Sequence, residues 1–324
     1  MDSPVPGGKG NMQGVLQGFS VVLILIGIGL LTSIALPRKR AAIAQGLTPL
    51  IFYITNPALM FTLLASTDLR AVVGVFTPIA LLVAVVTGAA YALVARLVFK
   101  TPAHRLPAAA MSTSYVNAGN IGVPLALYAV GSTSPVVSVL IAQLLIIAPV
   151  YLCMFAVLSR ANSGAADSSH GGKMILKSIA NPVTIATFLG AVFSFFGLEL
   201  PEVIHAPVQM IGDASIPLLL MSFGMALYGQ RPFSDKDLRG EIYLATAFKV
   251  FFMPLIAWLA ARFAFGLSGI ELLGVVIMAA LPTAQNVLLF AQQFKLPVAV
   301  PREVVLASTL LTFPSVLVIA FLLS

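Results

Sequence analysis

Polar and helix-breaking residues interrupt the apolar stretch expected at 105–130. Between Asn117 and Pro124 lie two asparagines, two glycines and a proline, including Gly119 and Asn120. Proline removes a backbone donor and clashes with the preceding turn, and glycine has a poor helix propensity, so this run predicts a broken helix. Lipid cannot satisfy the freed backbone groups, and such a break is tolerated only where it packs in protein or lines a watery cavity. We therefore expect it to bind a polar solute, with tight packing between helices as the alternative.

A second polar run, again with a proline, lies in the apolar stretch expected at 269–293. It contains Pro282, Thr283, Gln285 and Asn286. Paired interruptions in matching segments of two halves point to a transport site. Broken helices direct backbone N–H groups and positive dipole ends at one point, which favours an anionic or strongly polar solute. Amide side chains add neutral donors and acceptors.

These two runs and one further position supply the candidate substrate-binding residues. Asn56 is added because it precedes Pro57, and Pro217 lies at the matching place of the second half. Asn56 could alternatively cap a kink. The nine candidates are Asn56, Asn117, Gly119, Asn120, Pro124, Pro282, Thr283, Gln285 and Asn286.

The elements that position these residues are membrane-spanning helices. Of the 324 residues, 59% are hydrophobic and 9% are charged, against about 25% charged in a soluble domain. Runs such as 21–31 are continuously apolar, whereas the strands of a membrane barrel alternate apolar and polar residues. The sequence predicts an all-α membrane protein with ten spans, at residues 15–36, 43–66, 72–99, 105–130, 135–159, 174–197, 205–229, 241–265, 269–293 and 297–323.

Lysine and arginine gather in alternate links between the expected spans. Thirteen fall in the odd-numbered links, and the even-numbered links hold Arg70 and, at a helix end, Arg262. Cytoplasmic links carry the excess of positive charge, so we expect both termini outside the inner membrane of a bacterial-type cell. The net charge of +7 then reflects topology and not nucleic-acid binding. The thirteen are Arg38, Lys39, Arg40, Lys100, Arg105, Arg160, Lys173, Lys177, Arg231, Lys236, Arg239, Lys295 and Arg302.

A shift of about 165 residues places the second half of the chain over the first. It aligns Arg96 with Arg262 and Asn120 with Asn286. Each half holds five expected spans, and this odd number makes the second half enter the membrane from the opposite side, which is typical of secondary transporters. The expected organisation is a disordered leader at 1–14, a first five-helix repeat at 15–160, a cytoplasmic linker at 161–173 and a second five-helix repeat at 174–324.

Two ionisable residues fall well inside the expected spans, Asp213 and Lys249. A charge at this depth is costly and usually functional. Their expected depths are similar enough for the two to pair, so Asp213 is the candidate for H⁺ or Na⁺ coupling and Lys249 for a counter-charge or a partner of a substrate carboxylate. We expect Asp213→Asn to remove any pH dependence of transport. The alternative is that one of them reaches the interface through its long side chain.

The sequence shows no pattern of catalysis. His104, His170 and His205 are far apart, which argues against a metal cluster. A phosphate-binding P-loop motif is missing, which argues against an ATP-driven pump. Cys153 is the single cysteine and lies in an apolar stretch. We expect no catalytic residue, no metal and no cofactor, and hence no enzyme.

The chain resembles the auxin efflux carrier family, which includes bacterial malate and malonate permeases and the plant PIN-type auxin carriers. The resemblance rests on the run from Asn117 to Pro124, on Asn56-Pro57, on Ile216-Pro217 and on Leu281-Pro282. It implies ten helices in two inverted five-helix repeats, crossed broken helices four and nine, and elevator-like alternating access. It also implies that spans three to five and eight to ten move against spans one, two, six and seven.

The expected function is secondary active transport of a small organic anion, a carboxylate or an auxin-like molecule, across the lipid bilayer. A channel and a non-transporting membrane receptor are the alternatives. A homodimer is kept as a hypothesis for the assembly.

Overall fold

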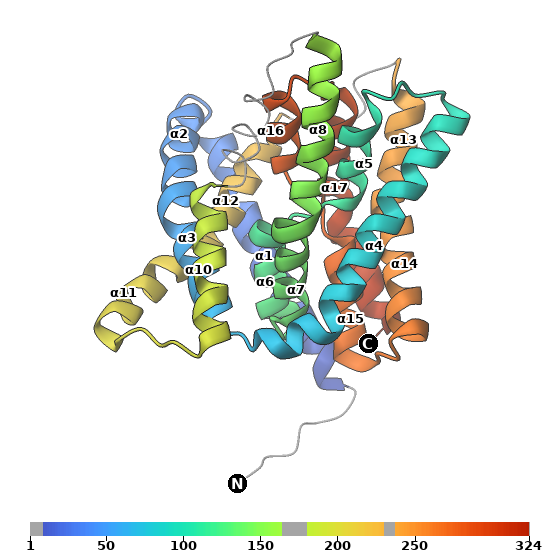
Figure 1. The fold of residues 1–324 in the computed structure, drawn as a ribbon. Coiled ribbons are helices and arrows are strands. Elements are labelled where there is room, and N and C mark those ends of the chain that lie inside the picture. The colour runs from blue at the N-terminus through green and yellow to red at the C-terminus, as the bar shows by residue number, and fades with distance from the viewer. Residues whose placement is uncertain (1–8, 164–179, 230–236, 324) are drawn as a thin grey trace.

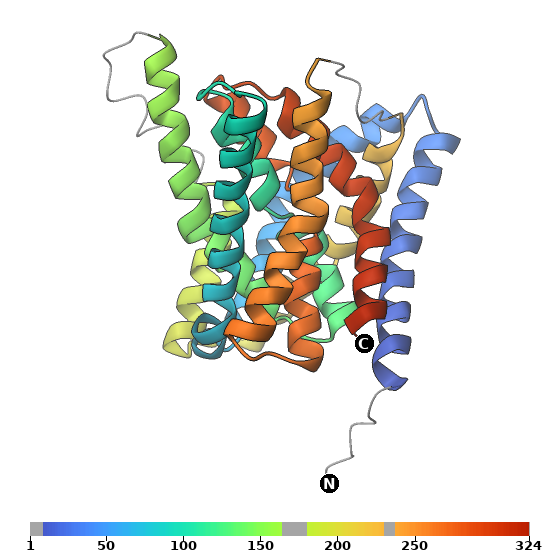
Figure 2. The ribbon, with the colours of Figure 1, turned by 90° about the vertical axis from the view of Figure 1, so that its right-hand side faces the viewer.

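The computed structural model describes residues 9–163, 180–229 and 237–323, and within these ranges every regular element is helical. The helices stand side by side between two ends of the molecule (Figures 1 and 2). The expectation of an all-α chain is thereby confirmed. Several expected features lie outside the described residues: 1–8 of the leader, 164–173 of the linker, 174–179 of the sixth span, and Lys173, Lys177, Arg231 and Lys236.

Residues 9–163 form helices joined by short turns. The first helix begins at Lys9, ahead of the span expected from residue 15. Here α marks α-helices and η marks π-helices. The elements are α1 Lys9–Ala35, α2 Arg40–Leu50, η1 Ile51–Thr55, α3 Asn56–Ala65, α4 Leu69–Val98, α5 Leu106–Ser114, η2 Ala118–Gly122, α6 Val123–Leu125, η3 Ala126–Val130, α7 Ser134–Ala142, η4 Gln143–Ile147 and α8 Ala148–Ser163.

The later part of the chain is built in the same way. A side-chain cap opens its first described helix, where the Asn181 Oδ1 accepts a hydrogen bond from the Thr184 N–H at 3.0 Å. The elements are α10 Pro182–Phe196, α11 Glu202–Asp213, α12 Ser215–Leu227, α13 Arg239–Ala247, η5 Phe248–Phe252, α14 Met253–Leu259, η6 Ala260–Ala264, α15 Gly269–Ala280, α16 Asn286–Gln293 and α17 Ala299–Leu323.

Prolines explain most of the π-helical turns. A π-helical segment comes directly before the α-helical turn that begins with or contains Pro57, Pro124, Pro149 or Pro254. Proline cannot donate to the carbonyl four residues earlier and its ring clashes there. A wider turn relieves both problems, so these helices continue past the proline.

The outer surface of the helices is apolar. Val203, Phe263 and Phe321 are exposed by 85%, 71% and 72%. Six helical segments in the described ranges are long and apolar enough to cross a bilayer, and shorter apolar helices cover Ser20–Ala35, Pro182–Phe196 and Gly269–Ala280. Such a surface is suited to lipid.

The two ends of the molecule differ in charge. The turns after α1, after α4 and after α16 carry the basic residues Arg38, Lys100 and Lys295, and they lie at the same end (Figures 1 and 2). The start of α1 and the end of α17 lie at the opposite end.

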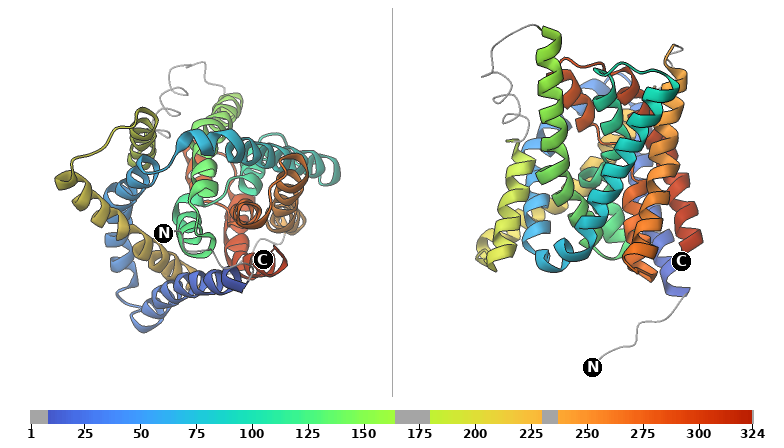
Figure 3. Two further views of the ribbon diagram at one scale, coloured as in Figure 1. Left: turned by 90° about the horizontal axis from the view of Figure 1, so that it is seen from below. Right: turned by 45° about the vertical axis from the view of Figure 1, so that its right-hand side comes forward.

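Viewed along the helices, the chain separates into two groups (Figure 3). The first contains α1, α3, α10, α11 and α12, which contact one another: α3 with α10 and α11, and α1 with α12. The second contains α4, α5, α7, α14, α15 and α17, and α4 contacts both α5 and α7. The helices that lead into the two interruptions, α5 and α15, belong to the second group and Asn56, in α3, to the first, and the half-helix after the first interruption also contacts α1 and α12.

Equivalent hydrogen bonds recur 166 positions apart. The Arg96 side chain donates to Thr101 O at 3.0 Å, and the Arg262 side chain donates to Leu267 O at 3.5 Å. The backbone repeats the pattern, since the Thr101 N–H donates to Ala95 O and the Leu267 N–H donates to Ala261 O. The two parts of the chain thus end a corresponding helix with the same turn and the same arginine.

Two glycines allow α1 and α12 to pack backbone against backbone. A methyl group on Gly29 would overlap the backbone of Met221, and one on Gly224 would overlap the backbone of Ile26. Small residues at such crossings let helices approach closely in a membrane. These two glycines fix how closely α1 and α12 can approach.

Candidate functional site

The two interruptions meet and pair through their backbones. The Asn117 N–H donates to Pro282 O at 2.8 Å, and the Ala284 N–H donates to Tyr115 O at 3.1 Å. Val116 and Thr283 form an isolated antiparallel bridge at the centre of this pairing. Extended backbone from two helices, 167 positions apart in the chain, therefore satisfies its own polar groups without lipid or water.

Side chains from several helices form further hydrogen bonds where the two interruptions pair. The Thr283 Oγ1 donates to Ser112 O at 2.6 Å, and the Thr283 N–H donates to the Ser308 Oγ at 3.1 Å. The Thr312 Oγ1 donates to Ala280 O at 3.4 Å. The first interruption is thus tied to the second, and the second to α17.

The place where the two interrupted helices pair is called the crossing below. A half-helix leaves the crossing on either side, with its N-terminus at the crossing. After the first interruption the chain continues as η2, α6 and η3, and after the second as α16 (Figure 1). The first turn of a helix has N–H groups without partners inside the helix and a partial positive charge. Gly119 and Asn120 lie in one such turn, and Asn286 begins the other. This arrangement can bind an anion between two positive ends.

The predicted residues of the two runs differ in exposure. Asn117, Pro124, Pro282 and Thr283 are buried, and Thr283 is 1% exposed. Gly119 and Asn120 are half-buried, and Gln285 and Asn286 are exposed. The structure brings both runs to one crossing, and the binding role of each residue stays a prediction.

Asn56 lies in the other helix group, beside buried polar groups that sequence analysis missed. Its Oδ1 is buried and has no hydrogen-bond partner, as is true of the Thr55 Oγ1 and the Ser215 Oγ. Thr55 ends η1, Ser215 begins α12, and α12 contacts both η1 and η2. Buried polar atoms rarely lack a partner, so a polar ligand or water is the expected partner. Thr55 and Ser215 lie two residues before Pro57 and Pro217, and this shared spacing was the available signal.

The structure does not bring Asp213 and Lys249 together. Asp213 is exposed and ends α11, whereas Lys249 is 1% exposed and its Nζ donates to Ala279 O at 2.9 Å and to the Met253 Sδ at 3.0 Å. The pairing expected from their depths is therefore absent between these two described residues. Ion coupling by Asp213 stays a prediction.

Two buried carboxylates were not among the predicted ionisable residues. Glu241, which is 7% exposed, accepts a hydrogen bond from Arg105 at 3.0 Å. Glu303 is fully buried and pairs with Arg302 at 3.2 Å. Glu241 begins a predicted span, and Glu303 lies six residues inside the last one, and sequence alone does not show which groups surround them.

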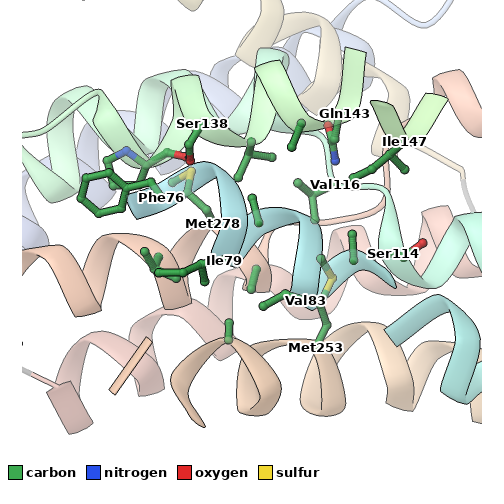
Figure 4. A pocket seen from close by; sticks show the side chains of 18 residues that line it. Phe76, Ile79, Val83, Ser114, Val116, Ser138, Gln143, Ile147, Met253 and Met278 are labelled. Carbon is green, nitrogen blue, oxygen red and sulfur yellow. The ribbon is translucent and has the colours of Figure 1, made fainter. Parts of the chain in front are cut away.

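A cavity adjoins the crossing on its α4 side. It encloses about 430 Å³ of space free of protein atoms, part of it open to the surroundings. Figure 4 shows Ser138 and Gln143 on one side and Val83 and Met253 on the other. Its walls come from α4, α5, α7, η4, α14, α15 and the first interruption, and none of the nine predicted residues lines it. The lining of this cavity is mainly apolar, which does not suit a polar solute.

Metal-binding side chains do not gather in groups of three or more anywhere in the described ranges 9–163, 180–229 and 237–323.

Removing the Thr283 hydroxyl tests how much the crossing depends on side-chain bonds. Thr283→Val keeps the shape and leaves Ser112 O buried without its partner, which costs about 1–3 kcal/mol. We expect a lower midpoint of thermal unfolding in detergent. Thr48→Val is the matched control, because Thr48 makes the same kind of bond to Ala44 O at 2.8 Å on an exposed helix face. Equal midpoints for the two variants would contradict the prediction.

Comparison with known proteins gives the family. The model of the family described as "Membrane transport protein" matches residues 19–320. The chain belongs to this family. It is a multi-pass membrane protein, and the resemblance to auxin efflux carriers seen in the sequence is confirmed.

Two kinds of relatives accompany this family match. A Rhizobium meliloti (strain 1021) protein named "Putative malonate transporter" is 27% identical over 216 residues, which cover 65% of each chain. An Oryza sativa subsp. japonica protein named "Probable auxin efflux carrier component 1b" is 28% identical over 152 residues, which cover 45% of this chain and 27% of the relative. The matches thus cover less than two thirds of each relative's own length.

Proposed function

We propose that this membrane transport protein is a secondary active transporter that binds a small organic anion where the two interrupted helices cross. The observation that carries the proposal is the backbone pairing of Asn117 with Pro282, because it holds two half-helix N-termini at one place. Two positive helix ends and the amides beside them suit a carboxylate. Both relatives are named for the movement of carboxylates or auxin, which supports this substrate class.

The binding site extends to the other helix group. Asn56, Thr55 and Ser215 carry buried oxygens without partners on the helices that face the crossing. A substrate held between the two groups would satisfy them. Movement of the group that carries the crossing past the group that carries Asn56 would then expose the site to each side in turn, as in elevator-type alternating access.

The recurring bonds at Arg96 and Arg262 support two inverted five-helix repeats, because the same helix end is rebuilt 166 positions later. The basic turns lie at one end, and the start of α1 and the end of α17 lie at the other, which supports an inner-membrane topology with the termini outside.

Uptake into proteoliposomes tests the function. Radiolabelled malonate is offered to vesicles loaded with unlabelled malonate or with buffer, and indole-3-acetic acid is tested in the same way. A carrier is expected to saturate and to accelerate when unlabelled substrate is present on the far side. Unsaturable flux without acceleration would indicate a channel and contradict the proposal.

A parallel measurement detects binding without transport. A ligand that binds the folded state raises the unfolding temperature by mass action. We expect small carboxylates to stabilise the purified protein and uncharged analogues of equal size to leave it unchanged. A protein that neither takes up nor binds any carboxylate would refute the proposal.

A further inference from the structure

A buried lysine, Lys249, lies beside the second interruption, and the proposed function assigns no role to it. Lys249 lies in η5 and is 1% exposed, and its Nζ donates to Ala279 O at 2.9 Å and to the Met253 Sδ at 3.0 Å. It forms no ion pair with any carboxylate of the described ranges. The nitrogen is thus directed at a backbone carbonyl and a thioether.

That carbonyl belongs to the end of a broken helix. Ala279 is the penultimate residue of α15, so its carbonyl is among the last four, which lack partners within the helix. If the helix continued, the Thr283 N–H would be its donor. The Thr283 N–H instead bonds the Ser308 Oγ. The interruption therefore removes a donor from Ala279 O, and Lys249 supplies another.

The location is also one that favours a positive charge. The C-terminal end of a helix carries a partial negative charge. In ion-coupled carriers, unwound carbonyls and half-helix C-terminal ends bind the coupling cation. Here a side chain of the protein fills that position next to the crossing.

We propose that Lys249 is a tethered cation that takes the place of a dissociable coupling cation at the C-terminal end of α15. It is a positioning residue, because it acts on the backbone of the interruption. One consequence of this proposal is that uptake does not require Na⁺. Only this consequence rests on the proposed function.

The experiment compares Lys249→Ala, Lys249→Met and Lys249→Arg with Lys39→Ala, in which an exposed lysine is removed. Thermal unfolding of each purified protein is measured with methylammonium, Na⁺ or the bulkier choline as the added cation. Malonate uptake is measured with the same three cations. Unfolding needs no substrate, so this readout stays valid if the protein does not carry malonate.

We expect wild type, Lys249→Arg and Lys39→Ala to unfold and transport alike in all three cations. Lys249→Ala is expected to lose roughly ten-fold in uptake, since a buried carbonyl loses a charged donor. Methylammonium or Na⁺, but not choline, is expected to recover its stability and uptake. Lys249→Met fills the space and is expected to stay impaired in every cation.

Four results would overturn the proposal. In the first, Lys249→Ala behaves as Lys39→Ala, and in the second, Lys249→Ala loses stability that neither methylammonium nor Na⁺ restores. In the third, Lys249→Arg behaves as Lys249→Met. In the fourth, uptake by the wild type requires Na⁺. If cations restore the stability of Lys249→Ala while wild type carries no carboxylate, the proposed function fails and the role of Lys249 stands. If Lys249→Ala does not fold, Lys249→Arg is compared with Lys249→Met, and equal behaviour of these two variants overturns the proposal.

Discussion

Asn117→Ala is expected to reduce carboxylate uptake by about ten-fold or more, because a hydrogen bond to a charged group is worth about 1.5–3 kcal/mol and about 1.4 kcal/mol is a factor of ten. The variant should remain folded. The bond that holds the crossing comes from the Asn117 backbone N–H, at 2.8 Å from Pro282 O, and alanine keeps it. The amide side chain is the part that is lost.

The measurement is initial uptake in proteoliposomes, together with the amount of folded protein. Asn286→Ala is expected to behave in the same way, because Asn286 begins the other half-helix at the crossing. Gln292→Ala is the matched control, since Gln292 is an exposed amide in the last turn of that same helix, α16. Uptake by Asn117→Ala equal to that of Gln292→Ala would remove Asn117 from the site.

Gly29→Ala is expected to have the largest effect on stability. The added methyl group would overlap the backbone of Met221, which cannot rotate away as a side chain can. Overpacking of a tight interface costs about 1–3 kcal/mol and occasionally more. The helices α1 and α12 must then move apart. Because both belong to the helix group that carries Asn56, the packing of that group is disturbed.

Gly27→Ala is an internal control for this prediction. Gly27 lies in the same helix two residues earlier, and a methyl group there would meet nothing within 4 Å. Both changes raise helix propensity equally, so the difference between them measures packing alone. We expect a clearly lower thermal midpoint for Gly29→Ala, and equal midpoints would show that α1 and α12 do not pack as closely as described.

The interruptions could be predicted from sequence because their cause is local. Pro124, Pro282 and the glycines and asparagines near them disfavour a helix whatever surrounds them. The assignment of an apolar all-α chain is local in the same sense, because it depends on composition and on the length of apolar runs. The family resemblance rests on these same runs, and it is confirmed.

The roles of the ionisable residues could not be predicted in this way. Asp213 and Lys249 were placed at similar depth by counting residues, but depth along two helices does not fix which faces meet. Asp213 lies at an exposed helix end, and Lys249 turns to a carbonyl on α15. Glu241 and Glu303 are buried as well, and sequence analysis missed both, since the burial of a charge depends on neighbours from other helices.

The sequence by itself determined that the chain is a membrane protein, that two of its helices are interrupted, and which family it belongs to. Each of these follows from the residues of one segment or from their order. Only the tertiary structure decided that Asn117 bonds Pro282, that Lys249 replaces a lost backbone donor, and that Gly29 meets Met221. The physical reason is that a freed backbone group must find a partner in lipid, but its local sequence does not say which distant group will supply it.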